Sequence, residues 1–200
     1  MVKRILWLIL MLAVFVQTAV ADGKSDAGKV VRQTVDSCLD WLKEKDLSDD
    51  AKYDNIVTCI TPVFDFALMG KLALGKKQWP RLDEAQRKEY TRLFIQQLQN
   101  SYARKIMLFS GETIEYEEPL QVKSKVHVGT SVVSTDGRNK ILYKLYKSKT
   151  GWKVYDVEIK GVSIVSSYRA QYAEIMKTGT AETLLNRMKE KVNQDDEKKE

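Results

Sequence analysis

The side chains best suited to chemistry are few in this sequence, and they lie far apart along the chain. His127 is the only histidine, which leaves at most one imidazole base and excludes a histidine-rich metal site. Cys38, Cys59 and His127 would supply three zinc ligands, but structural zinc sites normally contain a closely spaced ligand pair such as C-x2-C, and the sequence has none. We therefore expect no metal and no cofactor.

Two carboxylates are flanked by apolar or aromatic residues. Asp65 lies between two phenylalanines and Asp156 lies between Tyr155 and Val157, so the two carboxylates, if paired, could act as general acid and base. We favour structural roles, with Asp65 at a helix end and Asp156 on the solvent face of a strand. The sequence has no G-x-S-x-G motif, phosphate-binding loop or dinucleotide fingerprint. An enzyme is not expected.

The two cysteines, Cys38 and Cys59, lie in separate segments with helical periodicity. They are nearly equidistant from a loop centred near Ser48, so two antiparallel helices would bring them to the same height. A disulfide across this loop would contribute roughly 3 kcal/mol in the chain-entropy model. Two buried free thiols remain the alternative, because disulfide geometry cannot be read from sequence.

The first 21 residues have the features of a cleavable signal peptide. Lys3 and Arg4 precede a continuous apolar run over residues 5–16, and Ala19-Val20-Ala21 forms an A-x-A cleavage site. The run is shorter than the about 20 apolar residues that span a membrane. We expect an exported chain with a single domain over residues 22–192 and a charged, disordered tail over residues 193–200. Its basic residues are scattered among acids, which argues against nucleic-acid binding.

Helical periodicity dominates the first half of the chain. We expect a helix over about 24–45, a second capped by Ser48 or Asp49 and interrupted at Pro62, and a short apolar helix ending at Gly75. A capping-box-like start at Asp83 opens a helix of about 25 residues. Two further helices are predicted near the C-terminus, over 165–176 and from Thr180 onward.

From residue 113 the apolar period changes from 3.6 to 2, which indicates strands joined by short hairpins. The predicted fold class is α+β, with a curved antiparallel sheet of about four to five strands wrapped by N-terminal and C-terminal helices. One sheet face is apolar and must be covered by the helices. Tyr102, Tyr143, Tyr155 and Tyr168 all fall on predicted inward faces, which suits the mouth of a cavity as well as a plain core.

Three motifs in the same order resemble one known family. They are FDFALMGKLALGKKQW, YTRLFIQQLQNSYARKI and GWKVYDVEIKGVSIVSSYRAQY. Together they resemble the MlaC family of periplasmic phospholipid-binding proteins, over about residues 30–188. The resemblance implies a loosely nuclear-transport-factor-like fold whose apolar cavity holds the acyl chains and leaves the head group towards solvent.

The resemblance also implies a function and partners. It predicts a soluble, monomeric periplasmic carrier that moves phospholipid between an outer-membrane lipoprotein–porin complex and an inner-membrane ABC transporter complex with a substrate-binding ring, and so maintains outer-membrane lipid asymmetry. The residues expected to contact lipid come from the apolar helix, the long helix, the sheet and the sheet-to-helix corner. They are Phe64, Met69, Leu72, Leu93, Leu98, Tyr102, Ile106, Val126, Val128, Tyr143, Tyr155, Val157, Val162, Ile164 and Tyr168.

Three other functions compete with this one. A carrier of another apolar molecule, such as a hopanoid or a free fatty acid, would use the same cavity. A nuclear-transport-factor-like enzyme with an Asp base would need a carboxylate inside the cavity, whereas alternation places Asp156 outside it. A ligand-free adaptor would pack its apolar faces completely together.

Overall fold

The computed structural model describes residues 17–109, 111–135 and 137–197, so most of the predicted signal peptide lies outside the described residues. The described residues form six α-helices, one 3-10 turn and six strands, as predicted for an α+β fold. The helical elements are α2 (Gln17–Lys43), α3 (Asp49–Ile60), α4 (Phe66–Gln78), η1 (Trp79–Arg81), α5 (Glu84–Met107), α6 (Ile164–Thr178) and α7 (Ala181–Glu197). None of the described helices is long and apolar enough to cross a membrane.

Side-chain caps explain where several helices begin. Ser48 caps α3, and its hydroxyl accepts a hydrogen bond from the Ala51 N–H. Asp83 and Gln86 form the complete capping box that opens α5. Each of these contacts satisfies backbone N–H groups that have no partner within the helix. The predicted helix starts at these positions are confirmed.

Backbone restrictions explain where the helices are interrupted. α3 ends at Ile60, two residues before Pro62, as proline's missing N–H and fixed φ require. Gly75 has φ +80° and ψ 164°, a non-helical conformation that divides α4 into two helical segments, so the first segment ends at Gly75 as predicted. A residue with a side chain would be strained at that φ, whereas glycine adopts it freely.

The six strands form one antiparallel sheet. Its order is β1-β3-β4-β5-β6, with β2 also paired to β3. The strands are β1 (Thr113–Tyr116), β2 (Leu120–Val122), β3 (Lys125–Ser134), β4 (Gly137–Ser148), β5 (Gly151–Ile159) and β6 (Val162–Ser163). Short connections join β3 to β4 and β4 to β5, as the turn residues predicted.

A β-bulge in β5 reverses one predicted side-chain direction. Val154 pairs with Leu145 and Asp156 pairs with Lys144, so Tyr155 is an extra residue with no partner of its own on β4. Tyr155 makes an edge contact with Tyr146 and lies under the Lys125 ammonium, on the opposite face from Val154 and Val157. The prediction that Tyr155 faces inward is therefore wrong, because a bulge shifts the alternation by one residue.

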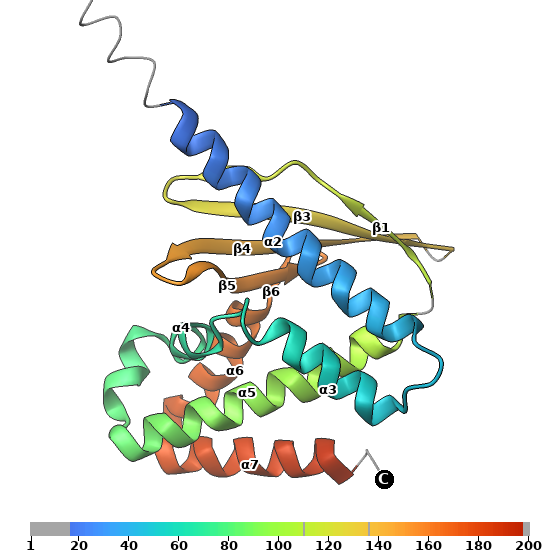
Figure 1. Cartoon of the computed structure of the whole chain (residues 1–200). Helices are drawn as coiled ribbons and strands as arrows, with labels where there is room; N and C mark the ends of the chain where they lie inside the picture. Colours follow the sequence, from blue (N-terminus) through green and yellow to red (C-terminus); the bar gives the residue numbers. More distant parts are fainter. Residues whose placement is uncertain (1–16, 110, 136, 198–200) are drawn as a thin grey trace, which may run out of the picture.

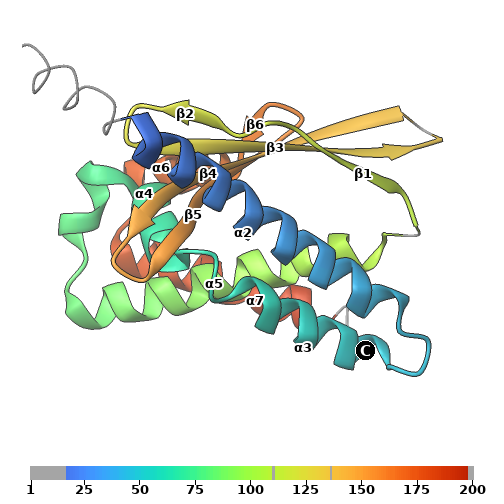
Figure 2. The same cartoon turned by 45° about the horizontal axis from the view of Figure 1, so that its top comes forward.

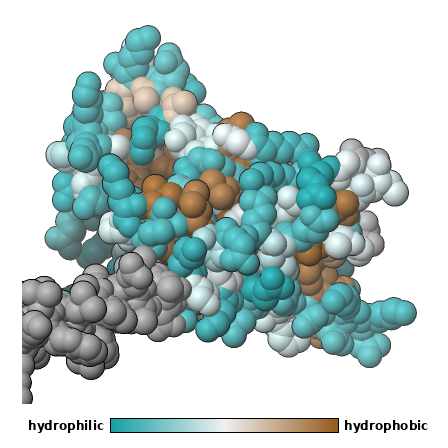
Figure 3. Space-filling view, turned by 90° about the horizontal axis from the view of Figure 1, so that it is seen from above, coloured by the Kyte–Doolittle hydropathy of each residue, from teal (hydrophilic) through white to brown (hydrophobic). Residues whose placement is uncertain are grey.

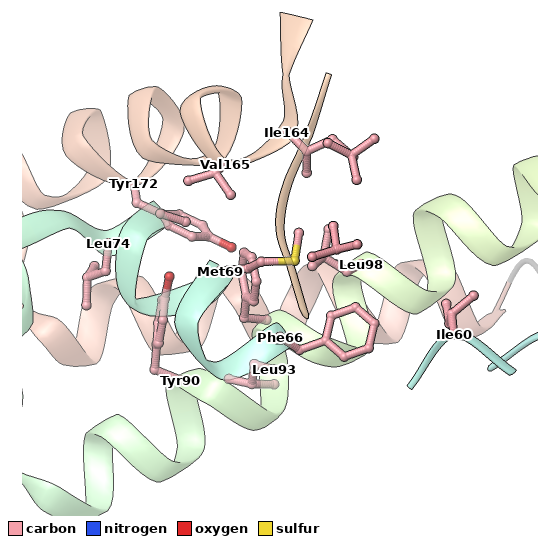
Figure 4. Packing of buried hydrophobic residues seen from close by; sticks show 14 of the residues in the cluster. Ile60, Phe66, Met69, Leu74, Tyr90, Leu93, Leu98, Ile164, Val165 and Tyr172 are labelled. Atoms are coloured by element: carbon pink, nitrogen blue, oxygen red, sulfur yellow. The ribbon is translucent and has the colours of Figure 1, made fainter. Parts of the chain in front are cut away.

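Four helices, α4 to α7, form a layer below the sheet, and α2 runs diagonally across one face of it; we call α2 the strut. Figures 1 and 2 show α2 running across one face of the sheet, while α4, α5, α6 and α7 pack together at the other side of the molecule. The buried core of this helical layer is shown in Figure 4, where side chains of α4, α5 and α6 point toward one another. α3 packs against both α2 and α5 and so connects the strut to the layer.

The predicted disordered tail is helical for most of its length. α7 extends to Glu197, and the Arg104 side chain donates a hydrogen bond to the Asp195 carbonyl. Lys191 and Asp195 form an ion pair one turn apart. Val192, the last apolar residue of the helix, is buried. The packing of Val192 and the contacts of Asp195 thus extend α7 through the first part of the charged segment, as far as Glu197.

Candidate functional site

One face of the sheet is largely apolar, with Thr130 and Asn139 as polar positions among its apolar residues, and we call it the inner face. Its positions follow from the register, in which Val126, Leu145 and Val154 lie side by side on three strands. These three side chains are 0, 0 and 1 % exposed. This end of the inner face is a closed core.

Exposure rises along the inner face toward the β3–β4 hairpin. The next row holds Val128, Tyr143 and Val157, of which Tyr143 is only half-buried. In the row after it, Ile141 and Ile159 are both half-buried. The sheet thus changes from a closed core to a partly uncovered apolar surface within two rows.

Helix α2 lies opposite this partly uncovered part of the inner face. In its apolar stripe, Val31 and Cys38 are buried, whereas Val35 and Leu42 are half-buried. We call the half-buried residues of this region the apolar wall; they are Val35 and Leu42 on α2, and Ile114, Val132, Ile141, Tyr143 and Ile159 on the inner face. In the space-filling view of Figure 3, apolar surface shows in two areas, each bordered by hydrophilic residues.

Tyr143 shows that the wall is an interior surface. Burial raises the pKa of its phenol to about 12, against an ordinary value of 10.0, and the nearby Cys38 thiol raises it further. A hydrogen bond with Thr130 opposes the shift. A ring that is partly accessible yet strongly desolvated lies in a recess rather than on the outer surface.

A pocket of about 380 Å³ opens between α2 and the β1–β2 connection and reaches the inner face at Val128. A methylene occupies roughly the 30 Å³ of a water molecule, so two chains of about 16 carbons need roughly 1,000 Å³. The pocket is thus smaller than the cavity expected for a complete phospholipid. Half-buried apolar residues beside it supply the remaining surface.

The predicted lipid-contact residues fall into three groups. Val126, Val128, Tyr143 and Val157 lie on the inner face as predicted. A second group belongs to the core of the helical layer and its edge: Met69, Leu93, Leu98 and Ile164 are buried there, and Leu72, Tyr102, Ile106 and Tyr168 are half-buried against it. Phe64 stacks on Phe66 where the α3–α4 connection bridges to β5.

Two of the predicted residues lie away from the apolar wall. Tyr155 is on the outer face because of the bulge, and Val162 is 61 % exposed where β6 begins, immediately after the β5–β6 turn. Six wall residues are absent from the predicted set, namely Val35, Leu42, Ile114, Val132, Ile141 and Ile159. Strand alternation places Val132, Ile141 and Ile159 on the apolar face. The sequence alone does not show where α2 crosses these strands, and so which residues it leaves half-buried.

The candidate catalytic carboxylates have structural partners. The Asp156 carboxylate is 6 % exposed and accepts hydrogen bonds from the Lys144 ammonium (3.1 Å), the Ser163 hydroxyl (2.8 Å) and the Val165 N–H (3.2 Å). It points to the outer face as predicted, but the turn into α6 covers it, so this part of the outer face is not solvated. Asp65 caps α4 and accepts a hydrogen bond from the Tyr146 hydroxyl. Neither carboxylate points at the apolar wall.

His127 and the cysteines form no metal centre. Burial lowers the pKa of His127, which pairs with Lys144 and Leu120 on the outer face. Among the described residues, no three His, Cys, Asp or Glu side chains come together as metal ligands.

The two cysteines are neighbours, as the antiparallel arrangement of α2 and α3 predicted. Both are free thiols, and the Cys59 thiol donates to the Thr34 carbonyl at 3.6 Å. Burial and the adjacent Cys59 raise the pKa of Cys38. A protonated, buried thiol is a poor nucleophile, so Cys38 is poorly suited to nucleophilic catalysis.

The family model of the MlaC protein matches residues 32–190, which include the entire sheet and the helices from α3 to α6, together with the second part of α2 and the first part of α7. The chain belongs to the MlaC family. A solved structure of a phospholipid-binding protein from Ralstonia solanacearum, in complex with a phospholipid, is also similar. The two chains are 26 % identical and superpose with a TM-score of 0.76, over 85 % of this chain and 98 % of the other. The MlaC fold and the expected family relationship are thus confirmed.

Proposed function

We propose that this MlaC-family chain is a periplasmic phospholipid carrier. The observation that carries the proposal is the apolar wall: a desolvated but incompletely covered surface between the sheet and α2, in a fold whose Ralstonia relative is described in complex with a phospholipid. The carboxylates of Asp65 and Asp156 accept hydrogen bonds from Tyr146 and from the Val165 N–H, away from the apolar wall, which favours binding over catalysis.

The energetics of lipid transfer require such a surface. Burial of a methylene is worth about 0.8 kcal/mol, so an acyl chain of about 16 carbons costs roughly 13 kcal/mol to expose to water. A carrier that covers the chain removes this cost without any reaction. Because the wall residues are already half-buried between the inner face and α2, binding moves α2 and α3 away from the inner face as the chains enter.

The proposed transport route starts from the expectation that the chain is exported. The signal peptide over residues 1–21 directs it to the periplasm, where the monomer exchanges phospholipid between an outer-membrane lipoprotein–porin complex and an inner-membrane ABC transporter complex with a substrate-binding ring. This exchange maintains outer-membrane lipid asymmetry. Release requires a partner that opens the space between α2 and the sheet or competes for the chains.

Native mass spectrometry of protein purified from periplasm without detergent tests the proposal. We expect a stoichiometric added mass that lipid extraction identifies as phospholipid. A mass that matches a hopanoid or a fatty acid would make the chain a carrier of another ligand. A bare protein that also fails to take phospholipid from vesicles would contradict the proposal and favour a ligand-free adaptor.

A further inference from the structure

The pocket beside the apolar wall has a polar rim with two differently charged sides. It lies between the first half of α2 and the connection from β1 to β2, where Gly28 faces Pro119 so closely that a Cβ on Gly28 would lie 2.6 Å from the proline ring. The lining residues are Lys24, Ser25, Gly28, Lys29, Arg32, Tyr116, Glu117, Glu118, Pro119 and Val128.

The floor of the pocket is continuous with the inner face. Val128 is the buried neighbour of Tyr143, and Tyr116 pairs with Thr130 in the register. A molecule with an apolar part against Val128 and Tyr143 would therefore place its polar end among the charged residues of the rim.

The α2 side of the rim carries the positive charge. The Arg32 guanidinium lies 3.8 Å from the centre of the Tyr116 ring, which holds it over the pocket. Lys29 forms an ion pair with Asp26 at 3.6 Å, and the Tyr116 hydroxyl donates a hydrogen bond to the Asp36 carboxylate. Lys24 forms no ion pair with the carboxylates of the described chain.

The opposite side of the rim carries carboxylates. Glu117 is paired with Lys140 at 2.9 Å, so its charge is already balanced. Glu118 forms no ion pair with any described cation. Once the paired groups are set aside, two cations on α2 face one carboxylate across the pocket.

We propose that this pocket holds the head group of a zwitterionic phospholipid, with the phosphate toward Lys24 and Arg32 and the head-group amine toward Glu118. The inference rests on the proposed phospholipid-carrier function. A guanidinium binds phosphate oxygens with two parallel hydrogen bonds, and a carboxylate is the natural partner of an ammonium group. An anionic glycerol head group has no ammonium to place there and offers Glu118 only neutral hydroxyl donors, so the carboxylate gains no opposite charge. The volume of about 380 Å³, at the lower end of small-molecule pockets, suits a head group rather than a whole lipid.

Competitive extraction from vesicles tests the assignment. The wild-type protein and each variant are incubated with vesicles of equal phosphatidylethanolamine and phosphatidylglycerol, reisolated, and their bound lipids quantified by mass spectrometry. The test variants are Glu118→Gln and the double variant Lys24→Gln, Arg32→Gln. Matched controls carry the same changes on exposed residues far from the pocket: Glu174→Gln on α6 for the single variant, and Lys76→Gln on α4 with Arg187→Gln on α7 for the double variant.

A partly exposed charge pair is worth up to about 1 kcal/mol, so each effect is a change of about two- to fivefold. We expect Glu118→Gln to lower the bound ratio of phosphatidylethanolamine to phosphatidylglycerol by this factor with total lipid unchanged. The double variant lowers the uptake of both lipids. If phospholipid binds but the ratio and uptake of both test variants match the controls, the head-group assignment is wrong and the carrier function stands. If wild-type protein extracts neither lipid, both fail.

Discussion

Filling the apolar wall at Ile141 should block lipid binding without unfolding the protein. Ile141 is half-buried on the inner face, in a row where Ile159 is also incompletely covered, so a larger side chain has space there. Trp has about six more non-hydrogen atoms than Ile and displaces about four methylenes of a bound chain, each worth about 0.8 kcal/mol. The loss of about 3 kcal/mol corresponds to about two orders of magnitude in lipid affinity.

The neighbouring residue supplies a matched control. Leu142 is half-buried on the same strand but faces the outer side of the sheet, so Leu142→Trp adds the same bulk on the opposite face. The assay is titration of each purified, delipidated variant with vesicles that contain a fluorescent-chain phospholipid, together with thermal unfolding. Ile141→Trp should lose affinity and keep its melting temperature, and Leu142→Trp should keep its affinity.

The buried end of the same face predicts the opposite outcome for stability. Val126 is 0 % exposed, and overpacking such a site costs typically about 1–3 kcal/mol. Val126→Trp should therefore unfold at lower temperature than Ile141→Trp. Equal lipid affinity of Ile141→Trp and Leu142→Trp, or equal destabilisation at positions 126 and 141, would refute the account of a wall that opens toward the β3–β4 hairpin.

Three further predictions concern the supporting structure. Asp156→Ala removes the anchor of α6 and leaves Lys144 with one partner, so the free energy of unfolding should fall by about 3 kcal/mol and the melting temperature by roughly 6–12 °C; an unchanged melting temperature would contradict this. Folding raises the pKa of Tyr143 from 10.0 to about 12, so it holds its proton more tightly when folded, and the stability advantage of wild type over Tyr143→Phe should fall as pH rises through that window. A flat difference across this range would be inconsistent with a desolvated ring. Mild oxidation should join Cys38 to Cys59, giving a chain two hydrogens lighter in intact mass, and persistent labelling of both thiols would exclude the bridge.

Local signals in the sequence predicted most of the secondary structure correctly. The capping box at Asp83, the cap at Ser48 and the break before Pro62 depend on residues within four positions of each boundary. Alternation also gave the inner-face positions of β3 and β4 correctly, because no bulge interrupts the residues that were assigned.

The errors arise where one strand or helix depends on another. The bulge that turns Tyr155 outward is a property of the pairing between β4 and β5, and alternation within β5 alone gives no sign of it. Asp156 was placed on the correct face, but its burial depends on the turn into α6, which returns over the strand. The periodicity of a single segment predicts neither the bulge nor the burial of Asp156.

The site itself was only partly predictable. Helical stripes containing Met69, Leu93 and Leu98 look the same in sequence whether they contact a ligand or another helix, and here they form the core of the helical layer. The wall residues Ile141 and Ile159, by contrast, lie on strands and are only half-buried. That difference depends on where α2 crosses the sheet, which follows from packing across the whole domain.

The most direct test of the central claim is to locate the bound acyl chain. A phospholipid with a photoactivatable group in one chain is loaded onto the mature protein, irradiated, and the crosslinked residues are mapped by mass spectrometry. The account predicts adducts on the apolar wall, centred on Ile141, Tyr143 and Ile159. Adducts confined to the outer face around Tyr155, or scattered over exposed residues, would contradict it.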